Sequence, residues 1–213
     1  MKTGFVDFIE QKKGVIFDCD GVIIDSKKAN VKFYNLILKE LNLPPMNKEQ
    51  EDVVHSFTVY DSIKYIVPEE LFEKALEIGE KIPYIEVLHL IELEESLIDL
   101  LELLKKHGKK CAINTNRTTT MPFILSKYNL NNYFDPVVTA SIVKNPKPHP
   151  ESIFLILKEW DMEPDEVFFI GDSEVDEKTA QNVPVDFVSY KNPNLNGIFN
   201  IESYKEVVDW LRE

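Results

Sequence analysis

Acidic residues directly follow short apolar segments at two widely separated places in the chain. Asp18 and Asp20 end the run at residues 14–21, and Asp172 ends a similar run at residues 166–173, with Asp176 four positions further on. Carboxylates that converge on one site repel one another, and a hard divalent cation makes such a cluster tolerable. The acidic residues therefore predict a site for Mg²⁺, which is bound by few carboxylates and completed by water and substrate oxygens.

Two further segments add groups that could bind phosphate oxygens. Residues 110–116 form an apolar run that ends in Thr115 and Asn116, and Lys147 lies in a loop that is rich in proline. Carboxylates beside a lysine, a hydroxyl and an amide suit phosphate chemistry better than any other reaction class. We therefore expect the four segments to meet at one phosphate-binding site.

Strand and helix patterns alternate through most of the chain. Apolar runs at residues 14–21, 110–116 and 166–173 predict buried parallel strands, and weaker candidates lie at 136–139 and 184–188. Helical periodicity separates them at residues 96–107, 150–160, 173–181 and 204–212. This alternation predicts an α/β fold with a doubly wound parallel sheet, in which ligands bind beyond the carboxyl ends of the strands.

One segment interrupts the alternation. Residues 26–95 contain no convincing strand pattern, only helical ones such as 29–41 and 69–82, and they are too long for an ordinary connection. We interpret this segment as a small helical cap packed over the carboxyl edge of the sheet. The chain would then divide into an α/β catalytic core of residues 1–25 and 96–213 and a helical cap of residues 26–95.

The four segments together resemble the sequence motifs of the haloacid dehalogenase (HAD) superfamily. The run Asp-Cys-Asp-Gly-Val at residues 18–22 is similar to its first motif, and Thr115 with Asn116 to its second. Lys147, in Lys-Pro-His-Pro, looks like the third motif, and Gly-Asp-Ser-Glu-Val-Asp at residues 171–176 like the fourth. The resemblance covers nearly the whole chain and implies a HAD-like Rossmannoid core. The helical insertion after the first motif is similar to the small-cap branch, which includes phosphoglycolate phosphatase and β-phosphoglucomutase.

The resemblance also implies roles for these residues. Asp18 would be the nucleophile that forms an aspartyl-phosphate, and Asp20 would protonate the leaving oxygen and then deprotonate the attacking water. Asp18, the backbone carbonyl of Asp20 and Asp172 would hold Mg²⁺, with Asp176 in support. The phosphoryl oxygens would be bound by Thr115, the Asn116 backbone and Lys147. The implied enzyme is a phosphoric monoester hydrolase that acts on a small phosphate ester, with phosphoglycolate the first candidate.

Several alternatives stay open at this point. Asp20 together with Asp172 favours phosphoryl transfer over dehalogenation, while a β-phosphoglucomutase-like phosphomutase and a non-catalytic phospho-ligand-binding protein share the fold. His55 and Arg117 are candidates for contact with the substrate. The relatives carry a glycine in the cap loop that touches the substrate, whereas this chain has none between Gly21 and Gly79. Either the cap loop of this chain aligns with a different segment of the relatives, or the cap accepts a different leaving group.

Composition limits the partners. The 213 residues carry 24 Lys and Arg against 37 Asp and Glu, a formal charge of −13, which argues against nucleic acid and anionic membranes. The sequence has no apolar run long enough to span a bilayer and no secretory signal pattern, and two lone cysteines suit a reducing compartment. We therefore expect a cytoplasmic enzyme whose partner is a small-molecule phosphate ester. The sequence gives no prediction of oligomeric state.

Overall fold

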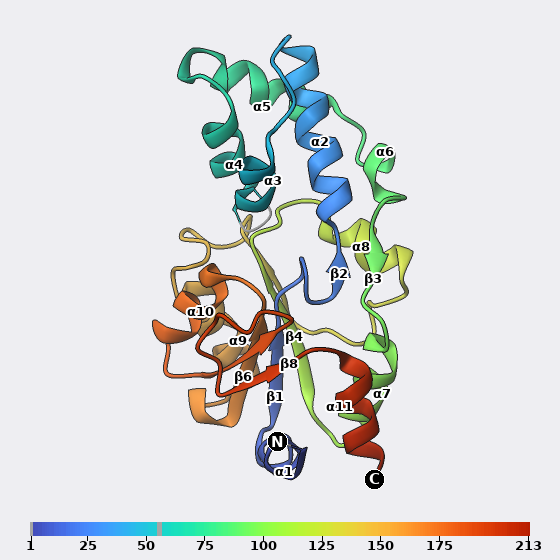
Figure 1. Cartoon of the computed structure of the whole chain (residues 1–213). Coiled ribbons are helices and arrows are strands. Elements are labelled where there is room, and N and C mark those ends of the chain that lie inside the picture. The colour runs from blue at the N-terminus through green and yellow to red at the C-terminus, as the bar shows by residue number, and fades with distance from the viewer. Residues whose placement is uncertain (1, 55–56) are drawn as a thin grey trace.

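A six-stranded parallel sheet forms the centre of the protein. The computed structural model describes residues 2–54 and 57–213. The strands lie in the order β5-β4-β1-β6-β7-β8. Strand β1 lies in the middle of the sheet (Figure 1) and pairs Gly14 with Lys110 on one side and with Val167 on the other. The strands are β1 (Gly14–Phe17), β4 (Lys110–Thr115), β5 (Val137–Thr139), β6 (Val167–Gly171), β7 (Asp186–Tyr190) and β8 (Phe199–Ile201).

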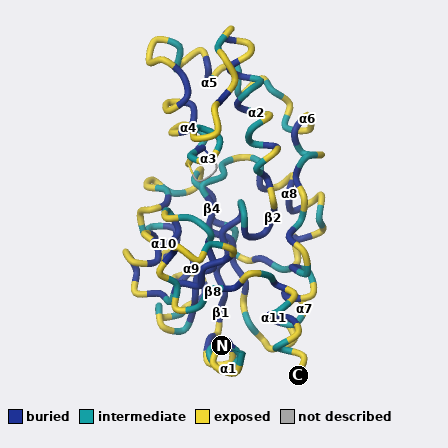
Figure 2. The backbone as a smooth tube through the Cα atoms, viewed as in Figure 1, coloured by how far each residue is buried: buried dark blue, intermediate teal, exposed yellow. Residues whose placement is uncertain are grey.

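Helices cover both faces of this sheet, because alternate strand side chains point to opposite faces. Val15 and Phe17 belong to a hydrophobic cluster with α1 (Lys2–Gln11), α7 (Leu97–Lys106), α8 (Met121–Lys127) and α11 (Tyr204–Arg212). Ile16 belongs to a second cluster with α9 (Glu151–Trp160) and α10 (Glu174–Gln181). Figure 2 shows the strands as the most buried part of the backbone. The predicted doubly wound α/β fold is confirmed.

A group of helices lies beyond the carboxyl ends of the strands (Figure 1). These helices have a third hydrophobic cluster of their own, which includes Ile37, Ile63 and Ala75. They are α2 (Lys27–Glu40), α3 (Lys48–Val53), α4 (Val59–Ile66), α5 (Phe72–Lys81) and α6 (Ile85–Leu88), with a short 3₁₀ helix at Glu69–Leu71. The chain passes between sheet and helices through β2 (Ile24–Asp25) and β3 (Glu92–Leu93), which pair in antiparallel fashion.

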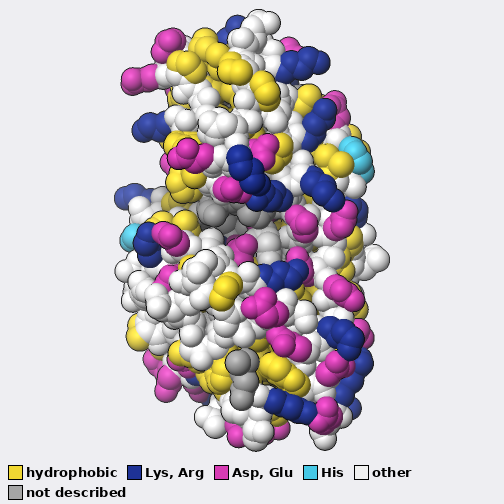
Figure 3. Space-filling model, viewed as in Figure 1, with side chains coloured by type: hydrophobic (Ala, Val, Ile, Leu, Met, Phe, Trp, Pro, Cys, Tyr) yellow, Lys and Arg dark blue, Asp and Glu magenta, His cyan; other side chains and the backbone are white. Residues whose placement is uncertain are grey.

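The sequence patterns missed the shorter elements. Strands β2, β3 and β8 have two or three residues each, too few to show an alternation, and α1 and α8 were not predicted either. A short 3₁₀ helix, Pro164–Glu166, also precedes β6. Among residues 2–54 and 57–213, no helix combines the length and the apolar character needed to cross a membrane. On the face shown in Figure 3, acidic and basic side chains are interspersed.

Candidate active site

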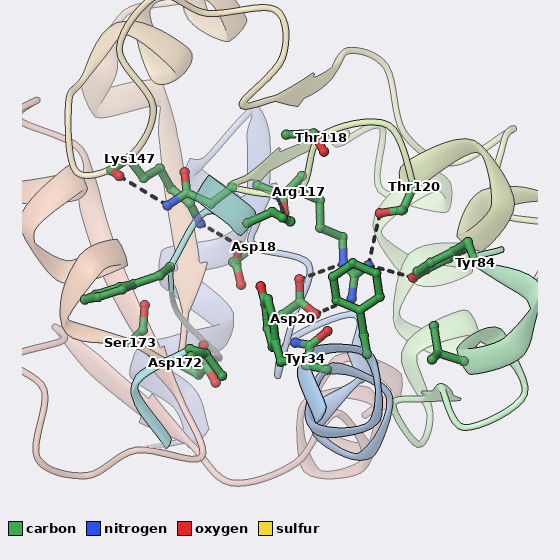
Figure 4. Close-up of a pocket in the computed structure, with 18 residues that line it drawn as sticks. Asp18, Asp20, Tyr34, Tyr84, Arg117, Thr118, Thr120, Lys147, Asp172 and Ser173 are labelled. Carbon is green, nitrogen blue, oxygen red and sulfur yellow. Dashed lines mark hydrogen bonds and ion pairs between the residues drawn. The ribbon is translucent and has the colours of Figure 1, made fainter. Parts of the chain in front are cut away.

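A cavity of about 90 Å³ lies where the carboxyl ends of the strands meet the helices above them. Figure 4 shows Asp18, Asp20, Arg117, Lys147 and Asp172 around this space, with Tyr34 and Tyr84 from the helical segment on the other side of it. Strand ends and the loops that follow them supply the polar wall, and α2, α6 and the loop before α4 supply a largely apolar one. The lining residues are Asp18, Asp20, Asn30, Phe33, Tyr34, Val54, Phe57, Val59, Tyr84, Val87, Thr115, Asn116, Arg117, Thr118, Thr120, Lys147, Asp172 and Ser173.

Lys147 bridges two carboxylates at the floor of the cavity. Its Nζ lies 2.5 Å from Asp18 Oδ1 and 2.6 Å from Asp176 Oδ1, and its side chain is only 4% exposed. Burial alone would lower the pKa of Lys147, but Asp176 and Asp18 outweigh burial and raise it, so the lysine stays charged. Burial raises the pKa of Asp18 to about 7, with Lys147 opposing the rise and the neighbouring acids Asp176 and Asp20 adding to it.

Three carboxylates gather around this lysine. Asp18, Asp172 and Asp176 each offer an oxygen atom, and these atoms all lie within 4.8 Å of one another. Burial, reinforced by Asp176 and Asp18, raises the pKa of Asp172 well above its ordinary value. A cluster of hard oxygen donors whose charges are incompletely compensated fits a divalent cation such as Mg²⁺.

Two glycines allow the acidic loops to come this close. Gly21 has φ of +81°, and a Cβ at this position would overlap the Asp172 carboxylate. A Cβ at Gly171 would overlap the Asp176 side chain. Asp176 is further fixed by Ser173, which caps α10 and donates its hydroxyl to Asp176 Oδ2 at 2.6 Å. These two glycines and the Ser173 cap therefore help to fix the positions of the acidic loops.

Thr115 and Asn116 lie at the end of β4, beside Lys147. Thr115 is 3% exposed, lines the cavity and accepts a hydrogen bond at Oγ1 from the backbone N–H of Arg117 at 3.1 Å. Asn116 donates from Nδ2 to the backbone carbonyl of Lys147 at 3.2 Å. This bond ties the loop after β4 to the loop that carries the lysine.

Arg117 holds Asp20 on the other side of the cavity. Its Nε donates to Asp20 Oδ2 at 2.7 Å and its Nη2 to Oδ1 at 2.6 Å, so the pair is bidentate. The Nη1 of Arg117 donates to the hydroxyls of Tyr84 at 2.7 Å and Thr120 at 3.1 Å. Ser26 also donates a hydrogen bond to Asp20.

The structure thus brings together all the site residues named from the four sequence motifs. Arg117 joins them, and its partner is an acid of the site. His55 lies outside the described residues. Sequence reasoning missed Ser26, Tyr84, Thr120 and Ser173; of these, only Ser173 carried a signal, since Ser with an acid three positions later is a capping-box pattern.

The fold and this site define a class of hydrolases: enzymes with a doubly wound parallel sheet, a cluster of aspartates and a lysine at its carboxyl edge, and an inserted helical segment beyond that edge. The chain belongs to the haloacid dehalogenase-like hydrolase family, whose pattern matches residues 15–190. The resemblance drawn from the motifs is confirmed, and so is the predicted enzyme class, a phosphatase of the HAD type.

Relatives cover nearly the full length of the chain. Pyrophosphatase PpaX from Bacillus cereus (strain B4264) is 30% identical over 197 residues, which cover 90% of this chain and 88% of that protein. A HAD-superfamily hydrolase of subfamily IA, variant 1, from Geobacter sulfurreducens PCA is 36% identical in its crystal structure, with a TM-score of 0.76 and coverage of 94% and 97%. A Haemophilus somnus 129pt protein described as a predicted phosphoglycolate phosphatase shares the fold at 21% identity, with a TM-score of 0.81 and coverage of 93% and 97%.

Proposed function

We propose that the protein is a Mg²⁺-dependent phosphatase that hydrolyses a small phosphate ester or anhydride through an aspartyl-phosphate on Asp18. The observation that carries this proposal is the arrangement of Asp18, Asp172 and Asp176 around Lys147, with three carboxylate oxygens within 4.8 Å of one another. A lysine and a divalent cation together offset the charge of a phosphoryl group as it approaches a carboxylate.

In this proposal the reaction has two steps. A carboxylate oxygen of Asp18 attacks phosphorus, the bond from phosphorus to the leaving oxygen breaks, and Asp20 gives its proton to that oxygen. Water then attacks the phosphorus of the aspartyl-phosphate, Asp20 takes a proton from the water, and inorganic phosphate leaves. Asp18 and Asp20 fit these roles because both line the cavity.

The remaining residues hold the phosphoryl group and its counter-ion. Asp18, Asp172 and the backbone carbonyl of Asp20 would bind Mg²⁺, with Asp176 supporting Lys147 rather than facing the substrate. Mg²⁺, when bound, supplies positive charge to the phosphoryl oxygens. Thr115, the Asn116 backbone and Lys147 would also bind those oxygens.

The helices over the cavity would form the cap of residues 26–95 and select the leaving group. Two lines of support point to a small substrate: the cavity measures only about 90 Å³, and the 30%-identical relative is named a pyrophosphatase. We keep phosphoglycolate as the first candidate among phosphate esters and add pyrophosphate beside it. Nothing in the charge pattern of the chain points to nucleic acid or an anionic membrane as partner.

The direct test is phosphate release from a panel of small phosphate compounds, with Mg²⁺ and with excess EDTA. We expect release that depends on Mg²⁺ and is fastest for a small anionic compound such as phosphoglycolate or pyrophosphate. A folded protein that binds Mg²⁺ but releases phosphate from no member of the panel would contradict the proposal and favour the phosphomutase or the phospho-ligand-binding protein.

Binding of Mg²⁺ should also stabilise the fold. At a concentration of about 100 times Kd, a cation that binds only the folded state adds about 2.7 kcal/mol to the free energy of unfolding. We expect Mg²⁺ to raise the Tm of the natural protein and to have much less effect on Asp172→Asn, measured by differential scanning calorimetry. The same substitution at the exposed Asp165 is the matched control. Equal Mg²⁺ shifts in the two variants would show that Asp172 does not hold the ion.

A further inference from the structure

A buried arginine faces the cavity on the side of the cap. The Arg117 side chain is 9% exposed, its partner Asp20 is 14% exposed, and both line the cavity. Burying a guanidinium is costly unless its donors are all satisfied. An uncharged side chain could fill this position at a lower free-energy cost of burial, so we expect the buried positive charge to have a function.

The geometry around Arg117 is that of an anion receptor. Two parallel N–H donors, from Nε and Nη2, bind the two oxygens of the Asp20 carboxylate, as a guanidinium binds a carboxylate or a phosphate group. The third nitrogen is anchored by Tyr84, the residue before α6, and by Thr120. The hydroxyls of Tyr84 and Thr120 would keep the Arg117 guanidinium in the same orientation if another anion replaced Asp20.

The two cations of the cavity serve different ends of it. Lys147 is bound to Asp18 and Asp176 at the phosphoryl end, whereas Arg117 lies between Asp20 and Tyr84 (Figure 4). Among the described lining residues, these two are the only Lys or Arg. A second negative charge on the leaving group would therefore be compensated at Arg117 and nowhere else in the described wall.

We propose that Arg117 is the specificity residue for a second anionic group, a carboxylate or a phosphate carried by the leaving group. This inference rests on the proposed function and deepens it. Arg117 donates to both oxygens of Asp20, the residue that must also reach the leaving oxygen. The second anion of the substrate takes the place of Asp20 on the guanidinium fork, and the Asp20 carboxyl becomes available to the leaving oxygen.

The kinetic test compares pairs of compounds that differ in the second charge. Phosphoglycolate is set against 2-hydroxyethyl phosphate, and pyrophosphate against methyl phosphate, so that the two pairs separate carboxylate from phosphate recognition. We expect the natural protein to favour the charged member of at least one pair in kcat/KM by about 100-fold, and Arg117→Gln to reduce that ratio by at least about tenfold. Lys64→Gln, which removes an exposed charge near Phe57 at the mouth of the site, should change the ratio less than twofold.

A binding measurement makes the result independent of turnover. With Mg²⁺ present, calorimetric titration with 3-phosphonopropionate, a phosphoglycolate analogue that cannot be hydrolysed, is compared with propylphosphonate. The natural protein should bind the former at least about tenfold more tightly, and Arg117→Gln should lose this preference. If this preference depends on Arg117 while no ester is turned over, the specificity role stands and the proposed phosphatase function fails.

Two results would overturn the inference. One is an equal loss of kcat/KM on charged and uncharged members of each pair, which would mean that Arg117 only positions Asp20. The other is a natural protein with no preference for the second charge in either measurement. Should Arg117→Gln fail to fold, Arg117→Lys decides instead: it keeps the charge beside Asp20 but loses the fork, and the charge preference should again fall by several-fold.

Discussion

Asp18→Asn is expected to lower kcat for phosphate release by about 10,000-fold or more. An amide in place of the carboxylate is a poor nucleophile, so no aspartyl-phosphate can form at a useful rate. The fold should survive, since the Lys147 ammonium keeps its second partner, Asp176, at 2.6 Å. Far-ultraviolet circular dichroism checks the fold, and single-turnover kinetics with the preferred substrate and Mg²⁺ measure the loss.

The matched control is the same substitution at Asp7, an exposed acid on α1 at the opposite end of the sheet. Asp7→Asn should retain the full rate. A residual activity of Asp18→Asn within about tenfold of the natural protein, in a preparation free of contaminating phosphatases, would mean that another group attacks phosphorus. The proposed mechanism would then be wrong even if Mg²⁺ is required.

Lys147→Met should damage both activity and stability. Removing one partner of a buried ion pair leaves uncompensated charge, here on Asp18 and Asp176, and typically costs about 3–5 kcal/mol in the free energy of unfolding. The loss of a cation beside the transferred phosphoryl group should lower kcat by about 100-fold to 1,000-fold. Urea denaturation in EDTA measures the first effect, and phosphate release with saturating Mg²⁺ the second.

Lys144 offers a matched control in the same loop. It is exposed, so Lys144→Met should change the free energy of unfolding by about 0.5 kcal/mol at most. An unchanged or raised stability of Lys147→Met would show that the carboxylates reach a neutral arrangement without the lysine. The ion pairs of Lys147 with Asp18 and Asp176 would then make no net contribution to the stability of the fold.

Sequence reasoning could locate the acidic site because its geometry follows from topology. Parallel strands end at one edge of a sheet, so apolar runs that end in Asp18, Thr115 and Asp172 had to deliver those side chains to one place. Gly21 follows Asp20 and Gly171 precedes Asp172, and the structure shows that a side chain at either glycine would overlap a neighbouring aspartate. The fold class followed from the same alternation of strands and helices.

The partners of Arg117 could not be predicted in the same way. Its bidentate bond to Asp20 spans 97 positions, and its bond to Tyr84 spans 33. Tyr84 is brought to the cavity by the packing of α6 against α2, which no local pattern encodes. The order of the edge strands also depends on long-range pairing, as with β8, whose three residues pair with β7. Such contacts are set by tertiary packing rather than by periodicity.

The separate hydrophobic cluster of α2 to α5 has an evolutionary consequence. Most buried residues of that cluster, such as Ile37, Ile63 and Ala75, do not belong to the two clusters that stabilise the sheet. Substitutions at these positions can reshape the side of the cavity formed by the helices without altering the sheet packing that positions Asp18. Such independence lets one lineage acquire new leaving groups while its phosphorus chemistry stays unchanged.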